Sequence, residues 1–125
     1  MRKEEFENVV QEAFDLLPEG FRSKIDNVRI TVEDYPSDDV VESMKIDRYS
    51  LLGLYQGIPL NKRGTWYGMT PTVPDTIHLY QKNIEAQTGD PASLRLRIAE
   101  VLFHELGHYF GMNEREVRQA MRSFL

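Results

Sequence analysis

The chain has 125 residues, of which 41% are hydrophobic and 28% charged, the balance of one globular domain rather than of a disordered chain. It contains no cysteine, which excludes disulfides and thiolate zinc sites, so any metal must be held by nitrogen and oxygen. The net charge of -5 argues against nucleic acid as a partner. We therefore expect a single domain over residues 1–125.

The sequence shows neither a membrane-spanning stretch nor a signal peptide, and both observations concern where the protein is located. No apolar stretch approaches the roughly 20 residues that a membrane-spanning helix needs. The first residues, MRKEEFENVVQEAF, are too acidic and too interrupted for a signal peptide. The sequence thus predicts a cytoplasmic protein with no membrane partner.

The first third of the chain predicts a helix and then a strand. Hydrophobic side chains recur at three- and four-residue spacing over residues 3–17, as in an amphipathic helix. Pro18 and Gly20 are expected to end that helix. Apolar and polar residues alternate over residues 27–33, which predicts a strand with one buried face.

The middle of the chain predicts two more strands between loops. Residues 35–40 are polar and predict a loop. LLGLYQG, residues 51–57, predicts a second strand, in which two glycines indicate a bulge or a close backbone approach. Residues 59–75 hold three prolines and two glycines and predict another loop. TIHLYQ, residues 76–81, predicts a third strand.

The last third predicts the longest helix. Asp90 is a candidate N-cap and Pro91 suits the first helical position, so the helix is expected over residues 91–110. Its apolar residues form a wide band, which predicts packing against the sheet on one side and another helix on the other. Gly111 stands where a left-handed glycine ends a helix, and a short helix over residues 114–124 is expected to follow.

The stretch FHELGHYFGMNE, residues 103–114, carries two of the three histidines. Residues four apart lie on one face of a helix, so His104 and His108 can direct their imidazole nitrogens at one point, as zinc requires. Glu105 lies about 100° round the helix, close enough for its carboxylate to reach a water on that metal. The spacing predicts two metal ligands and a general base, the H-E-x-x-H arrangement.

A catalytic zinc also needs a third protein ligand and one open position. The carboxylates downstream of the second histidine are Glu114 and Glu116. Because Gly111 lets the chain turn back, Glu114 is the expected third ligand, with Glu116 as the alternative. His78, the remaining histidine, falls in the third predicted strand and is expected to face solvent or the core.

The motif HELGHYFGMNE resembles the extended zinc motif of metzincin-type peptidases, with Glu114 in the place of their third histidine. The wider chain resembles the minimal zincin family of small bacterial zinc metallopeptidase-like domains, through LLGLYQGIPLNKRG, PDTIHLYQKNIE and RIAEVLFHELGHYFGMNEREVR. Metzincins also carry a methionine turn beneath the metal. Met121 follows the motif but falls in the last predicted helix, and it is not assigned that role.

The resemblance implies an α+β fold, in which a small mixed sheet packs against an N-terminal helix and the motif helix. It implies Zn²⁺ held by His104, His108 and Glu114, with Glu105 as the base. It also implies a peptide or protein substrate bound along a sheet edge at Thr76 to Gln81, by addition of a strand.

Three functions are compatible with these residues. In a metallopeptidase, Glu105 would take a proton from a metal-activated water and pass it to the leaving amine. A non-catalytic module would bind metal or peptide without cleavage. A metal-dependent ribonuclease is the third, because a family of ribosomal-RNA maturation enzymes spaces three histidines like positions 104, 108 and 114. Glu105 and the acidic balance argue against it, and the basic cluster at residues 61–63 is too short to change that.

Overall fold

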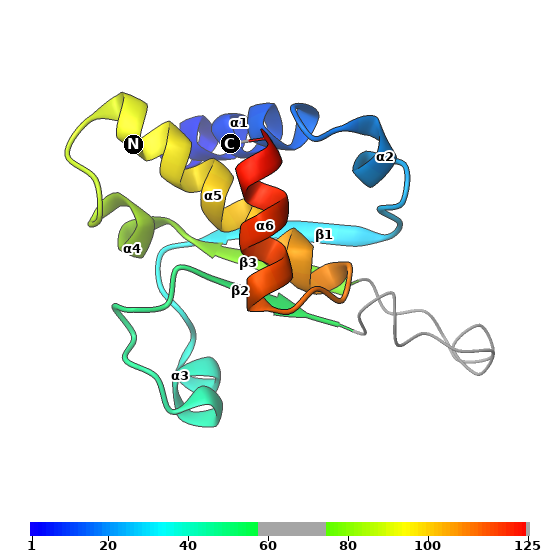
Figure 1. Cartoon of the computed structure of the whole chain (residues 1–125). Coiled ribbons are helices and arrows are strands. Elements are labelled where there is room, and N and C mark those ends of the chain that lie inside the picture. The colour runs from blue at the N-terminus through cyan, green and yellow to red at the C-terminus, as the bar shows by residue number, and fades with distance from the viewer. Residues whose placement is uncertain (58–74, 125) are drawn as a thin grey trace.

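The structure is a computed structural model that describes residues 1–57 and 75–124. Within these ranges three strands form one sheet in the order β1 (Val28–Glu33), β3 (Asp75–Tyr80) and β2 (Gly53–Gln56). β1 runs parallel to β3, and β2 runs antiparallel to it. Helices and this mixed sheet together make an α+β fold (Figure 1), which confirms the predicted class.

Two long helices, α1 (Lys3–Asp15) and α5 (Pro91–Tyr109), lie on one side of the sheet (Figure 1). α1 contacts β1, α5 contacts β2 and β3, and the two helices contact each other. The core lies between these two helices and the sheet, and its fully buried members include Phe6, Ile77, Leu79, Ile98 and Leu102. Burying such side chains contributes roughly 1.5–3 kcal/mol each. Because α5 also packs against α6 (Glu114–Phe124), the prediction that it is covered on two sides is confirmed.

Three short helices were not predicted: α2 (Glu19–Arg22), α3 (Asp38–Met44) and α4 (Gln81–Glu85). A loop is expected at residues 35–40, but its last three residues begin α3. The Ser37 side chain caps this helix by accepting a hydrogen bond from the Val40 N–H. The loop expected at residues 59–75 lies outside the described residues except for Asp75, which begins β3. No described helix is long and apolar enough to cross a membrane.

The third predicted strand is not a sheet edge. β3 pairs with β1 on one side and β2 on the other, so that Thr76 lies opposite both Arg29 and Gln56. Its backbone hydrogen-bonding groups are therefore used within the sheet, and a peptide has no free edge to pair with there. The expectation of an edge at Thr76 to Gln81 is wrong. Among the described strands, those with one neighbour are β1 and β2.

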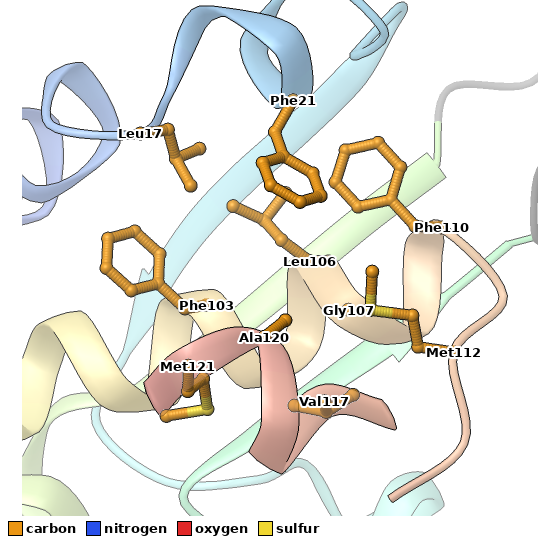
Figure 2. Close-up of a pocket in the computed structure, with 10 residues that line it drawn as sticks. All are labelled: Leu17, Phe21, Phe103, Leu106, Gly107, Phe110, Met112, Val117, Ala120 and Met121. Carbon is orange, nitrogen blue, oxygen red and sulfur yellow. The ribbon is translucent and has the colours of Figure 1, made fainter. Parts of the chain in front are cut away.

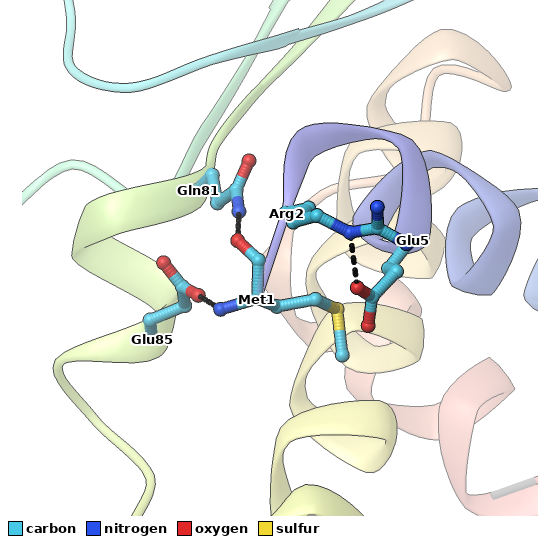
Figure 3. A network of polar contacts seen from close by, with 5 residues as sticks. All are labelled: Met1, Arg2, Glu5, Gln81 and Glu85. Carbon is cyan, nitrogen blue, oxygen red and sulfur yellow. Dashed lines mark hydrogen bonds and ion pairs between the residues drawn. The ribbon is translucent and has the colours of Figure 1, made fainter.

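The beginning of α1 is joined to α4 by polar contacts between distant residues (Figure 3). The Met1 ammonium group lies 2.8 Å from a carboxylate oxygen of Glu85. The Gln81 side-chain amide donates to the Met1 carbonyl over 2.6 Å. Both partners belong to α4, which follows β3 directly, so these contacts hold the start of α1 beside the end of the central strand.

Gly107 allows α6 to pack closely on α5. A Cβ at this position would lie 2.5 Å from Cγ2 of Val117, a side chain only 1% exposed. We expect Gly107→Ala to push α6 away and to lower the free energy of unfolding by about 1–3 kcal/mol, measured by urea denaturation. Gly20→Ala is the matched control, because no atom lies within 4 Å of its added Cβ. An equal effect in both variants would show that close packing at Gly107 is unimportant.

Candidate metal centre

The histidine pair lies near the C-terminal end of α5. The helix begins as predicted: Asp90 caps it by accepting from the Ser93 N–H over 2.9 Å, which lowers the pKa of the Asp90 carboxyl. His104 and His108 follow on a face left open to solvent, each side chain about one-third exposed. Their Nε2 atoms are 3.2 Å apart. The two imidazoles therefore converge, as their four-residue spacing predicts.

A glycine turn brings the next segment back toward these histidines. Gly111 has a φ of 83°, the left-handed conformation predicted for it. Its N–H donates to the His108 carbonyl and the Met112 N–H donates to the Gly107 carbonyl, each over 2.9 Å. These two bonds form a Schellman motif, which ends α5 and reverses the chain. Glu114 then opens α6 beside the histidine pair.

Three side chains meet at this point. Oε1 of Glu114 lies 3.3 Å from Nε2 of His104 and 3.2 Å from Nε2 of His108. With the histidine separation of 3.2 Å, these atoms form a nearly equilateral triangle. Zinc bonds of 2.0–2.1 Å at tetrahedral angles place ligand atoms about 3.3–3.4 Å apart. Two nitrogens and one oxygen at this spacing match the zinc geometry and fit the metal that the sequence predicts.

The alternative ligand, Glu116, is used elsewhere. Its carboxylate accepts from the Asn113 N–H over 3.0 Å, and the Asn113 side chain accepts from the Glu116 N–H over 2.9 Å. This reciprocal pair is a capping box at the start of α6. The N-x-x-E spacing was a readable sign of it in the sequence. Because the box holds Glu116 in place, Glu114 is the carboxylate that faces the histidines.

Glu105 lies on the inner side of the pair and is only 8% exposed. Its carboxylate and the two imidazoles have potential metal-ligand atoms within 4.8 Å of one another. Burial raises the pKa of its carboxyl, opposed by the neighbouring His104 and His108 and by a hydrogen bond from the backbone N–H of Tyr55. A buried, hydrogen-bonded carboxylate next to two metal-ligand candidates has the environment of a general base.

Gly53 brings β2 against this part of α5. A Cβ at Gly53 would lie 2.9 Å from Cγ1 of Val101 and 3.2 Å from Cγ of Glu105. The close backbone approach predicted from the glycines in residues 51–57 is therefore present at this position. It places the neighbouring Tyr55 amide within reach of the Glu105 carboxylate. The hydrogen bond between Tyr55 and Glu105 joins distant parts of the chain, and no pattern in the sequence predicts it.

The end of α5 is fixed by Tyr109, which is fully buried. Its hydroxyl accepts from the Asp26 N–H over 3.1 Å and lies 3.2 Å from the Asp26 carbonyl, to which it donates. Because these bonds satisfy the hydroxyl inside the protein, Tyr109 positions the histidine-bearing turn and does not face the metal centre.

His78 lies away from the metal centre. Its neighbours along β3, Ile77 and Leu79, are buried in the core, so the histidine points to the other face of the sheet. There its Nε2 lies 2.8 Å from the Gln56 side-chain oxygen, and its Nδ1 lies 3.1 Å from a Glu33 carboxylate oxygen. The ring thus joins side chains from all three strands. Nothing in this arrangement brings it to the other two histidines.

Two of the hollows that adjoin α5 differ in character. One, of about 290 Å³, includes His104 and Glu105 in its lining and is bounded by Gly53 and Met121. The other, of about 20 Å³, lies between α2, α5 and α6 and is lined by apolar side chains (Figure 2). The small one has room for about one water and offers no polar side chain to hold it. The larger one is the cleft at the metal centre. The sequence did not predict that Met121 lines this cleft.

An α+β domain whose long helix presents two histidines and a glutamate in H-E-x-x-H spacing is a domain of the zincin class. Residues 25–122 match the model of a family described as Zincin-like metallopeptidase. The match covers most of the chain, which therefore belongs to this family. No curated protein matches the chain. Membership implies a divalent metal, typically zinc, and a metal-dependent, peptidase-like function.

Proposed function

We propose that the protein is a zinc-dependent peptidase, in which His104, His108 and Glu114 hold the ion and Glu105 is the general base. The observation that carries the proposal is the triangle of two Nε2 atoms and one carboxylate oxygen, with sides of 3.2 to 3.3 Å. A buried carboxylate stands directly beside it. Family membership supports the same reaction class.

The residues divide the work of peptide hydrolysis. When bound, zinc supplies a Lewis acid that polarises a carbonyl and lowers the pKa of a water. Glu105 is held in place by the Tyr55 N–H and accepts a proton from the water that attacks the peptide carbonyl. The carbon–nitrogen bond then breaks, and Glu105 gives the proton to the leaving amine.

The non-catalytic module is the second candidate, and one observation favours it. Glu105 is 8% exposed, and its carboxylate is already engaged by a backbone amide, so a water has limited access to it. A ribonuclease has less support, because the glutamate between the histidines is placed as a base for water. The short basic cluster at residues 61–63 lies outside the described residues.

The proposal is tested by comparing zinc-loaded protein with protein stripped by a chelator. Both are incubated with a peptide library of mixed sequence, and new termini are identified by mass spectrometry, with a single-stranded RNA in parallel. We expect peptide cleavage by the loaded protein, none by the stripped protein, and recovery when zinc is returned. Absence of peptide cleavage by protein shown to hold zinc would contradict the proposal, as would cleavage of the RNA alone.

A further inference from the structure

We propose that the cleft beside the metal centre selects substrates carrying a carboxylate about three residues from the scissile bond, and that Arg97 is the residue that reads it. This inference rests on the proposed peptidase function, because it concerns the substrate of the same site. It is carried by the shape of the cleft, by the charges along it and by the position of Arg97 on α5.

The cleft extends from the metal centre toward the N-terminal end of α5. Its lining includes His104 and Glu105 at one end and Arg97 and Glu100 at the other. Arg97, Glu100 and His104 share one face of the helix, since they are spaced by three, four and seven residues. Leu51, Leu52 and Gly53 line it from the β2 segment and Met121 from α6. Apolar side chains and the Gly53 backbone thus make up much of the wall, and Arg97 is the positively charged residue that lines the cleft away from the histidines.

A further hollow, of about 400 Å³, adjoins the cleft. It is lined by Glu100, Arg118, Met121 and Arg122, and it shares Glu100 and Met121 with the cleft. Three arginines line the two hollows together with two glutamates, Glu100 and the candidate base Glu105, so positive groups exceed negative ones by one. This balance is opposite to that of the whole chain, whose net charge is -5. A local excess of positive charge beside an apolar cleft favours an anionic ligand.

Arg97 is the best placed of the three arginines. Its guanidinium lies 3.1 Å from the Glu100 carboxylate, and its side chain is 40% exposed, so it is held over the cleft and remains open to a ligand. The guanidinium has five N–H donors, and one carboxylate partner leaves donors for a second. The ion pair with Glu100 orients the group for that second partner.

The separation between Arg97 and the histidines sets the position of the selected group. Arg97 precedes His104 by seven residues, so their Cα atoms are offset by about two helical turns, roughly 10.5 Å along the axis of α5, and the cleft follows this direction. An extended peptide advances about 3.3 Å per residue. A carboxylate near Arg97 therefore lies about three residues from a carbonyl at the metal centre. The carboxylate can belong to an aspartate or glutamate side chain or to the end of the substrate.

The test uses zinc-loaded full-length protein and pairs of quenched fluorescent peptides. The members of a pair differ only by aspartate or asparagine at one position, which is moved from two to four residues away on each side of the cleaved bond. An amidated and a free carboxyl terminus, without acidic side chains, form a further pair that distinguishes the two carboxylate sources. We expect one position at which the acid raises kcat/KM by roughly tenfold, chiefly through KM.

In Arg97→Gln, the ratio of kcat/KM for the aspartate peptide to kcat/KM for the asparagine peptide is expected to fall to about one, because the carboxylate has lost its partner. Arg95→Gln is the matched control, because Arg95 is on the same helix but pairs with Glu12 of α1, over 2.9 Å. The control should retain the preference. Cleavage with no acid preference, or a preference that survives Arg97→Gln, overturns the inference while the peptidase proposal stands.

A binding measurement separates the two proposals if no peptide is cleaved. The same labelled peptides are titrated with the zinc-loaded protein and followed by fluorescence anisotropy. Tighter binding of the acidic member, lost in Arg97→Gln and kept in Arg95→Gln, supports the carboxylate site although the peptidase proposal has failed. Equal binding of both members, or Arg97-dependent binding of single-stranded RNA that displaces the acidic peptide, overturns the carboxylate site.

Discussion

Replacing His108 by alanine is expected to abolish zinc binding by the purified protein. The wild type should hold about one zinc per chain after dialysis, because three converging ligand atoms make a site of the zinc type. The variant loses one corner of the triangle that His104 and Glu114 complete in the wild type. Two remaining ligands bind zinc far more weakly, so elemental analysis should find only traces.

His78→Ala is the matched control for this measurement, because it removes the chain's third histidine without touching the metal centre. It should keep the wild-type zinc content. The two downstream glutamates give a second comparison, in which Glu114→Ala reduces zinc affinity and Glu116→Ala retains it, since Glu116 serves the capping box. Equal zinc in wild type and His108→Ala would show that the histidine pair is not the site.

Zinc binding should also be visible as stability. Glu114 belongs to α6 and the histidines to α5, so an ion held by all three would join the two helices. A ligand that binds only the folded chain stabilises it by about 2.7 kcal/mol at one hundred times its dissociation constant. Zinc should therefore raise the thermal midpoint of the wild type and leave that of His108→Ala unchanged. A similar rise in both proteins would indicate zinc binding elsewhere.

The parts of the site that the sequence predicted are those that depend on local geometry. Helical spacing places His104 beside His108, and a glycine past the last apolar residue predicts the turn at Gly111. Asp90 and Pro91 mark the start of the helix for similarly local reasons. Each of these predictions needs only a few neighbouring residues, and the structure shows each geometry.

The parts that the sequence did not predict depend on contacts between distant segments. Nothing local shows that β3 lies between β1 and β2, so the strand containing Thr76 was wrongly placed at an edge. The hydrogen bond from Tyr55 to Glu105 depends on how β2 lies over α5, which requires the whole fold. The cleft that joins Arg97 to Met121 is likewise formed by three separate segments. Pairing and packing at long range decide these features.

Glu105→Gln is expected to keep the zinc and lose the hydrolysis. Glutamine has nearly the same shape, and its oxygen can still accept the hydrogen bond from the Tyr55 N–H, so the buried position is preserved. It cannot take a proton from water. If Glu105 is the base, kcat/KM for a cleaved peptide should fall by about 10² to 10⁴-fold, while elemental analysis shows unchanged zinc.

Two controls decide what such a loss means. Glu4→Gln removes an exposed carboxylate on α1 and should leave the rate unchanged, which excludes a general effect of charge. Zinc content is measured on the same samples. Lost hydrolysis with unchanged zinc indicates a lost base, whereas lost hydrolysis with lost zinc is the result expected of His108→Ala. A Glu105→Gln variant that holds zinc and cleaves peptides at the wild-type rate would exclude Glu105 as the base. A variant that loses zinc would instead place the Glu105 carboxylate among the groups that hold the ion, since it lies with both imidazoles in one cluster.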